Sequence, residues 1–170
     1  MFRKIIVCIS LSIIILLSGC NKGIEPGEPA GPAGFEGKVT FIGNWPDSIK
    51  RTHVVVFKNP IFTSNDFFPP NLSFVVDSIP YRSTEFGYNS LEDNYIPLFQ
   101  LAAGSYSYVV VAQSKTIDIS LDRKDWFVVG VYCVGGDQTK PTALQILPGR
   151  ITKDVNIVVD FNNPPPQPPM

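Results

Sequence analysis

Histidine and cysteine, which supply many catalytic and metal-binding groups, are scarce in this sequence. Its 170 residues include one histidine and three cysteines, and 17% of them are charged. A histidine-dependent catalytic triad would have to use His53, and a zinc site with two histidine ligands is excluded. The sequence also lacks a Gly-x-Ser-x-Gly motif, a P-loop and a dinucleotide-binding fingerprint. We therefore predict a protein that is not an enzyme and that has no metal and no cofactor.

Helical periodicity and an excess of basic residues are also missing. No window of twelve residues has the apolar spacing of an amphipathic helix, and 16 prolines and 13 glycines interrupt the chain. The formal net charge of −1 gives no indication of a nucleic-acid partner. Hydrophobic residues nevertheless make up 44% of the chain, which is enough for a packed core. Together these features predict short strands in an all-β fold.

The N-terminal segment MFRKIIVCISLSIIILLSGC has the pattern of an export signal. Arg3 and Lys4 precede an apolar stretch over 5–17 that is shorter than the roughly 20 residues needed to span a bilayer. The sequence Leu-Ser-Gly-Cys over 17–20 resembles the lipobox of bacterial lipoproteins. This resemblance implies a signal peptide over 1–19, cleavage between Gly19 and Cys20, and a diacylglyceryl group on the Cys20 thiol. Several acyl chains together would hold the protein firmly to a membrane.

Two other interpretations of this segment remain open: a plain secretory signal with a chance cysteine, and an uncleaved anchor helix. Asn21, the residue after the expected anchor, lacks the acidic character that directs sorting in some lipoproteins. We expect a location in the cell envelope, in the outer membrane on its periplasmic or surface face. The expected partner through Cys20 is the membrane itself.

The composition divides the rest of the chain into three parts. Residues 20–36 are rich in Gly, Pro, Ala and Glu and are predicted to form a flexible tether. Residues 37–161 contain the apolar runs and are predicted to form the folded domain, and the Pro-rich tail over 162–170 is predicted to be disordered or to bind a proline-reading partner. Within the domain, alternating or apolar runs predict strands at 38–42, 51–58, 72–76, 96–101, 105–112, 126–133, 143–147 and 154–161. The run over 126–133 is apolar on both faces and is predicted to be a central strand.

Two segments resemble the prealbumin-like sandwich domains related to transthyretin and to the regulatory-like domain of carboxypeptidases. The first, FQLAAGSYSY over 99–108, is similar to a hairpin in which Gly104 turns the chain and Tyr106 enters the core. The second, over 148–161, is similar to the closing turn and last strand of that family, and 37–41 fits its first strand. The resemblance implies an antiparallel Greek-key β-sandwich of seven or eight strands. It implies no single activity, because members mostly act as accessory, spacer or binding modules.

The most distinctive candidate site is an aromatic-rich loop over 62–88. Exposed rings among serine, asparagine and proline are typical of sugar-binding or protein-binding surfaces, and Phe67, Phe68 and Tyr88 are the candidate ligand-binding residues. The alternative is that these rings cover the core beneath a long loop. A second cluster, Asp118, Asp122 and Asp125, has oxygen ligands suited to calcium, but its spacing differs from that of an EF-hand. Neighbouring Arg123 and Lys124 favour a solvated loop there.

These observations predict a lipid-anchored envelope protein that acts as a non-enzymatic accessory or scaffolding module. The alternative is a lipoprotein that binds a carbohydrate or another surface ligand through the loop 62–88. Under either hypothesis the expected partner is an envelope protein or a glycan.

Overall fold

Short strands dominate residues 31–170, the part of the chain that the computed structural model describes. The expected signal peptide (1–19), Cys20 and most of the expected tether lie outside these residues. The described part contains two 3-10 turns, η1 (Ser64–Phe67) and η2 (Arg123–Asp125), and no helix in it is long and apolar enough to cross a membrane. Its strands are β1 (Gly34–Ile42), β2 (Arg51–Phe57), β3 (Leu72–Val75), β4 (Glu85–Asn89), β5 (Gly104–Tyr106), β6 (Tyr108–Ser114), β7 (Trp126–Val131), β8 (Leu144–Ile146), β9 (Ile151–Thr152) and β10 (Ile157–Asp160).

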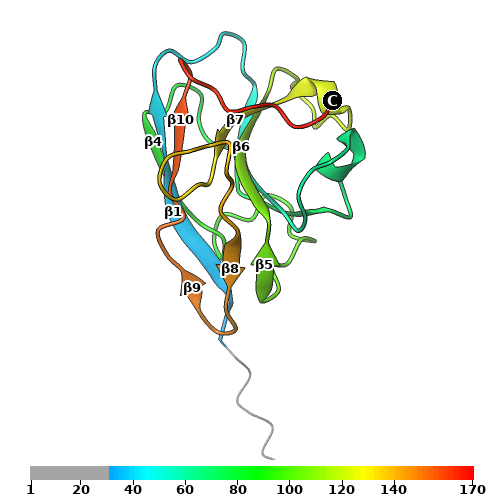
Figure 1. Cartoon of the computed structure of the whole chain (residues 1–170), viewed down its shortest axis with the longest axis vertical. Helices are drawn as coiled ribbons and strands as arrows, with labels where there is room; N and C mark the ends of the chain where they lie inside the picture. The colour runs from blue at the N-terminus through cyan, green and yellow to red at the C-terminus, as the bar shows by residue number, and fades with distance from the viewer. Residues whose placement is uncertain (1–30) are drawn as a thin grey trace, which may run out of the picture. The chain divides into compact units, whose positions relative to one another are not determined.

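The strands form two four-stranded sheets and one small pair (Figure 1). One sheet has the order β10-β1-β4, with β9 also paired to β1; the other has the order β3-β2-β6-β7; β5 pairs with β8. The all-β class is therefore confirmed. The pairing is antiparallel except along β1, which pairs in parallel with β9 and β10. The expectation of an antiparallel sandwich is wrong along this edge of β1, because the first strand of the domain runs in the same direction as its last two strands, β9 and β10. On its other edge β1 pairs with β4 in the expected antiparallel way.

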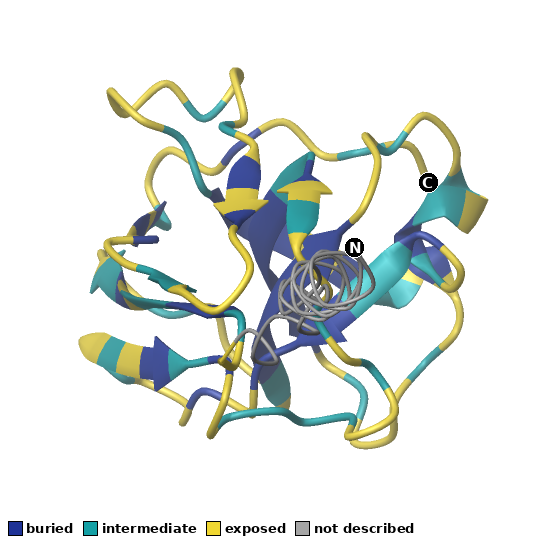
Figure 2. Ribbon diagram, turned by 90° about the horizontal axis from the view of Figure 1, so that it is seen from below, coloured by how far each residue is buried: buried dark blue, intermediate teal, exposed yellow. Residues whose placement is uncertain are grey.

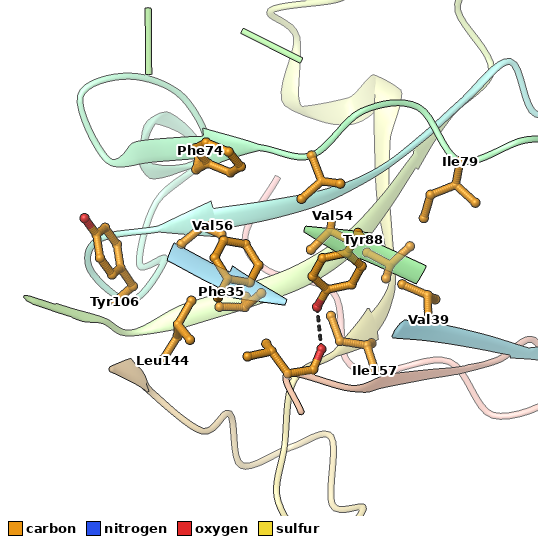
Figure 3. Packing of buried hydrophobic residues seen from close by; sticks show 14 of the residues in the cluster. Phe35, Val39, Val54, Val56, Phe74, Ile79, Tyr88, Tyr106, Leu144 and Ile157 are labelled. Carbon is orange, nitrogen blue, oxygen red and sulfur yellow. Dashed lines mark hydrogen bonds between the residues drawn. The ribbon is translucent and has the colours of Figure 1, made fainter. Parts of the chain in front are cut away.

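The main core lies between the two large sheets. Alternate residues of each strand point into it, for example Val54 and Val56 from β2 and Val39 from β1. Phe35 is fully buried and packs edge-to-face against Phe74 and Tyr88, with ring centroids 5.9 and 5.7 Å away (Figure 3). Figure 2 shows that the buried residues lie on strands in the middle of the domain and that most exposed residues lie on the loops around them. Period-two alternation in the sequence is what places these side chains on one face.

The beginning of β1 corrects the predicted boundary between tether and domain. The strand begins at Gly34 rather than at 37, and Glu36 already pairs with Asn89 of β4. Gly37 lies so close to the next segment that a Cβ atom there would stand 2.2 Å from the carbonyl oxygen of Val155. A glycine is therefore required at this point, and the Gly-rich composition that predicted a tether partly reflects close packing of β1.

Two other predictions of strand positions are wrong. Residues 96–101 form a turn rather than a strand, with the Phe99 amide donating to the Ile96 carbonyl. Pro97 removes a backbone donor in this segment, and the side chains of Ile96 and Phe99 instead pack onto the second sheet. Conversely, β4 lies inside the stretch that was expected to be a long loop. Its alternating residues Phe86 and Tyr88 face the core and carried a signal for a strand.

Strand β7 lies at the edge of its sheet, so the prediction of a central strand over 126–133 is also wrong. Both faces of β7 are covered nevertheless, which explains its apolar sequence. The C-terminal tail runs past β7 towards η2 (Figure 1). The Gln167 side chain bonds to both the amide and the carbonyl of Val128, and Pro165 is buried. The prediction of a disordered end over 162–170 is therefore wrong.

Candidate functional site

The sheet β3-β2-β6-β7 has a second apolar face, which points away from the other sheet. Along β2, Val54 and Val56 enter the main core, whereas Val55 and Phe57 belong to a separate buried cluster on the opposite face. We call this opposite side the outer face. It is covered by three irregular segments, 59–71, 93–101 and 115–125, rather than by another sheet. The site described below lies between the outer face and these segments.

A cavity of about 240 Å³ opens on the outer face. Its floor comes from the strands, with Ala112 of β6 paired opposite His53 of β2 and Val55 two residues further along β2. Its walls come from the covering segments, and almost every side chain is aliphatic or aromatic. The residues that line it are His53, Val55, Phe67, Phe68, Pro69, Leu72, Val75, Tyr95, Ile96, Phe99, Ala112, Ile119, Ser120, Leu121 and Trp126. Such a lining suits an apolar ligand that excludes water.

The first wall is held in place by a network around Asn71. Its side-chain oxygen accepts from the Asn59 amide at 2.8 Å, and its side-chain nitrogen donates to the carbonyls of Asn59 and Asp66 at 3.1 and 2.9 Å. The Asp66 carboxylate accepts from the Thr63 amide and hydroxyl at 2.8 and 3.0 Å, and these bonds hold the pKa of Asp66 below its usual range. The loop that presents Phe67 and Phe68 is thus fixed by hydrogen bonds at both ends.

Arg123 supports the same wall from behind. It is 4% exposed, and its guanidinium lies 4.4 Å from the centroid of the Phe67 ring. It donates to the carbonyls of Trp126 and Pro168, so one side chain joins η2, the cavity wall and the C-terminal tail. No carboxylate pairs with it among the described residues, and burial lowers its pKa. Its role here is structural, through carbonyl contacts and a cation–π contact.

The other walls are also fixed by polar side chains that point away from the cavity. The indole nitrogen of Trp126 donates to the Ser120 carbonyl at 2.8 Å, and the Ser120 hydroxyl donates to Asp125 at 2.6 Å. Arg51 donates to the Tyr95 hydroxyl at 2.8 Å and to the Ile117 carbonyl at 2.7 Å. These bonds leave carbon surfaces facing inwards, so the cavity is preorganised without placing charge inside it.

His53 is the main polar group at the cavity floor. It is 2% exposed, and its Nδ1 lies 3.0 Å from the carbonyl oxygen of Val76. Because a carbonyl only accepts, Nδ1 carries a proton in this contact. Burial lowers the pKa of His53, an effect that the Val76 carbonyl opposes. The ring is therefore neutral at pH 7, which is consistent with its contact with the Tyr95 ring at 4.7 Å.

The structure separates the three candidate ligand-binding residues. Phe67 and Phe68 line the cavity together. Tyr88 lies in the main core, where its hydroxyl donates to the Val155 carbonyl and burial raises its pKa (Figure 3). Phe67 and Phe68 therefore remain candidates, whereas Tyr88 performs the core-packing role that was the alternative. Aromatic content alone did not separate the two roles, because both sets of rings lie in the same stretch of sequence.

Sequence reasoning missed most of the cavity, including Trp126, Ala112 and the hydrophobic pair Ile119 and Leu121. A signal was present, because VVVF over 54–57 and WFVVGV over 126–131 are apolar at consecutive positions. Strands with two apolar faces must be covered on both sides. Because no amphipathic helix is predicted over 37–161, the loops were the segments available to provide the second cover.

The aspartate cluster is dispersed by local hydrogen bonds. Asp122 pairs with Lys124 at 2.8 Å, whereas Asp125 accepts from Ser120. Within residues 31–170, no group of three histidine, cysteine, aspartate or glutamate side chains is placed to hold a metal ion. Cys133 is half-buried just beyond the end of β7, and burial raises the pKa of its thiol. The neutral thiol is the less nucleophilic form.

A comparison with protein-family models, curated proteins and solved structures finds no match to this chain.

Proposed function

We propose that this protein is a non-enzymatic accessory lipoprotein of the cell envelope that binds a small apolar molecule in the outer-face cavity. The observation that carries the proposal is the cavity itself, which is preformed, lined by carbon and bordered by the paired rings Phe67 and Phe68. Protein interiors are normally packed to crystal-like density. A space of this size on a strand face with fixed walls is typical of a binding site rather than of a packing fault.

The cavity chemistry favours an apolar ligand over a sugar. A sugar ring needs several hydrogen-bond donors and acceptors around it, whereas this lining has few polar groups: those of His53, Tyr95 and Ser120, and the Trp126 indole nitrogen, which already donates to the Ser120 carbonyl. A cavity of roughly 150 Å³ lined by aliphatic and aromatic groups is known to admit benzene. At about 240 Å³, this cavity has room for one or two rings or a short acyl chain. The surface-ligand hypothesis is thus retained with a different ligand class.

The lipid anchor and the finer fold are part of the same proposal. The pattern over 17–20 supports lipid attachment at Cys20 and therefore membrane association, on the periplasmic or surface face of the outer membrane. Two sheets around one core, with Tyr106 buried in that core as the resemblance implies, support a prealbumin-like Greek-key sandwich. The expected hairpin over 99–108 is wrong, because Gly104 begins β5, which pairs with β8, and no strand precedes it over 96–101. Mass spectrometry of the mature N-terminus tests the anchor directly: an unmodified terminus, or one elsewhere than Cys20, contradicts this part of the proposal.

Ligand binding is tested with toluene and indole as probes and the mature chain carrying Cys20→Ser, which keeps every residue of the domain. Trp126 borders the cavity, so its fluorescence should change on saturation with toluene. The amide NMR signals near Ala112 should change with either probe and are the readout for indole, which itself fluoresces like tryptophan. The variant Ala112→Leu places a larger side chain at the floor and should weaken binding by roughly tenfold or more, since it fills space that the probe needs.

The matched control is Ala143→Leu, which adds the same side chain at an exposed position before β8. It should bind the probes as the parent chain does. If neither probe binds to the parent chain, or if both leucine variants weaken binding equally, then the cavity is not a binding site. The protein would in that case be a scaffold without a small-molecule ligand.

A further inference from the structure

The outer edge of β7, which pairs with no strand among the described residues, is bonded by side chains at the positions where a neighbouring strand would bond. The Val128 amide donates to the side-chain oxygen of Gln167 at 2.9 Å, and the Val128 carbonyl accepts from the side-chain nitrogen of the same residue at 2.7 Å. Further along, the Val131 amide donates to the side-chain oxygen of Gln138 at 2.8 Å. An edge strand normally presents such groups as a template for another chain. Here two glutamine amides replace the missing strand.

The tail that brings Gln167 to this edge cannot itself extend the sheet. Five of the nine residues over 162–170 are proline, and proline has no amide hydrogen to donate. The tail is held by the Gln167 side chain, by the bond from Arg123 to the Pro168 carbonyl at 3.2 Å, and by burial of Pro165. It therefore covers the edge through a few contacts and offers no new edge on its outer side.

Nothing on β7 itself would prevent pairing. Its sequence, WFVVGV, has no charged residue, although charges are a common protection of edge strands. Phe127 is 38% exposed on it. Removal of the tail would leave an apolar, uncharged strand with unpaired backbone groups. The protection of this edge thus depends on the tail and on Gln138.

We propose that the β7 edge is a strand-binding site whose occupant is β7 of a second copy, and that the C-terminal tail is a removable cap on it. Val128 directs both its amide and its carbonyl towards the edge, because the Gln167 amide bonds to both. In an antiparallel pair, two such residues placed opposite each other exchange both hydrogen bonds. A twofold axis at Val128 therefore lets each copy satisfy the other. Tail and second copy compete for the same backbone groups.

A second copy fits this edge better than an arbitrary strand does. Two identical β7 strands have no charge to leave unpaired, and their pairing would join two four-stranded sheets edge to edge. The proposal is independent of ligand binding, since it involves the edge of the sheet rather than the cavity on its outer face.

The test compares the mature chain with a version that ends at Phe161, both carrying Cys20→Ser to remove the lipid. Sedimentation should find the complete chain monomeric and the shortened chain in a monomer–dimer equilibrium. The dissociation constant of the shortened chain should be lower by roughly tenfold or more, because each dimer forms two hydrogen bonds that the tail otherwise occupies. Hydrogen exchange should find the Val128 amide protected in the dimer.

Two substitutions locate the interface. Phe127→Lys in the shortened chain puts like charges at the shared edge and should restore the monomer, whereas Val158→Lys, at a 49% exposed position of β10, should leave the dimer intact. A shortened chain that is folded by circular dichroism and monomeric at all concentrations overturns the proposal. So does a dimer that ignores Phe127→Lys, or a complete chain that dimerises with its tail in place. Binding of an added extended peptide without self-association would overturn the choice of a second copy.

Discussion

The two faces of the sheet β3-β2-β6-β7 each carry a buried apolar cluster but are covered by different kinds of structure. The inner face meets another sheet, and the packing is tight enough that a Cβ atom on Gly130 would lie 2.8 Å from a methyl group of Val159. The outer face meets three loops, and a cavity of about 240 Å³ remains beneath them. Regular strands present side chains at a repeating spacing that can interdigitate, whereas loops bend to satisfy their own backbone groups.

This difference assigns separate tasks to the two faces. The inner face supplies most of the buried apolar contact and hence the stability of the fold. The outer face is held by polar contacts such as those of Asn71 and Arg51, so its space can stay open without collapse. If the two faces differ in this way, matched substitutions on them should differ in cost.

Matched truncations of one ring on each face should differ in cost. Phe35→Ala removes a fully buried ring that packs against Phe74 and Tyr88, and it should lower the free energy of unfolding by about 3–5 kcal/mol. Phe67→Ala on the outer face should cost about 2 kcal/mol, because part of that ring already faces empty space. Urea denaturation measures both values. Equal costs would mean that the outer face is packed as tightly as the inner one.

Matched enlargements of one side chain on each face should also cost more on the inner face. Gly130→Ala forces a methyl group against Val159 and Ile157 and should destabilise the protein by about 1–3 kcal/mol. Ala112→Val adds more volume but directs it into the cavity, so its cost should be below about 1 kcal/mol. Thermal unfolding of the two variants beside the parent chain provides the comparison. A larger loss for Ala112→Val would contradict the presence of usable space.

Much of the fold, but little of the site, could be predicted from the sequence. The alternation over 38–42 and 154–161 marked β1 and β10, because one side of each strand is apolar and the other polar. Phe67 and Phe68 were identified as candidates from their composition. The cavity itself was not predictable, because it depends on three loops whose paths are set by particular bonds, such as that from Asn71 to Asp66. The continuous apolar run of β7 predicted a central strand, because nothing in the proline-rich tail indicated that the tail would cover an edge strand.

Acidification should weaken the outer face through His53. Burial lowers its pKa in the folded state, so the unfolded chain, with a histidine pKa of about 6.5, binds the proton more readily. Stability should therefore be constant above roughly pH 7 and fall as the pH decreases below 6.5, with a slope of at most about 1.4 kcal/mol per pH unit. The Arg51 charge lowers the pKa of His53 further, whereas the Asp77 charge raises it. The residues that β6 and β7 place beside the His53 ring are Ala112 and Trp126, which do not titrate.

Urea denaturation between pH 5 and 7.5 measures this slope. His53→Phe should flatten it, because the sequence contains no other histidine. The carboxyl groups of Asp66, Asp122 and Asp137 have lowered pKa values and stay ionised in this range. The NMR titration of the His53 ring provides a check on the parent chain alone. A midpoint at or above 6.5 would contradict the assigned direction.

The smallest expected difference is between two cationic side chains, Arg51 on the outer face and Lys38 on the β10-β1-β4 sheet. Arg51 joins two of the covering loops through Tyr95 and Ile117, and Arg51→Met should cost about 1 kcal/mol. Lys38 pairs with Glu85 at 2.9 Å on the uncovered side of the β10-β1-β4 sheet, where both side chains are about half exposed, and Lys38→Met should cost less than about 0.5 kcal/mol. Raising the salt concentration should reduce the cost of Lys38→Met further, because dissolved ions screen an exposed ion pair. It should leave the cost of Arg51→Met nearly unchanged, because Arg51 donates to a hydroxyl and a carbonyl rather than to a carboxylate. If both costs were equal and equally sensitive to salt, the polar contacts of the outer face would be ordinary surface contacts. The open cavity would then need another explanation for its fixed walls.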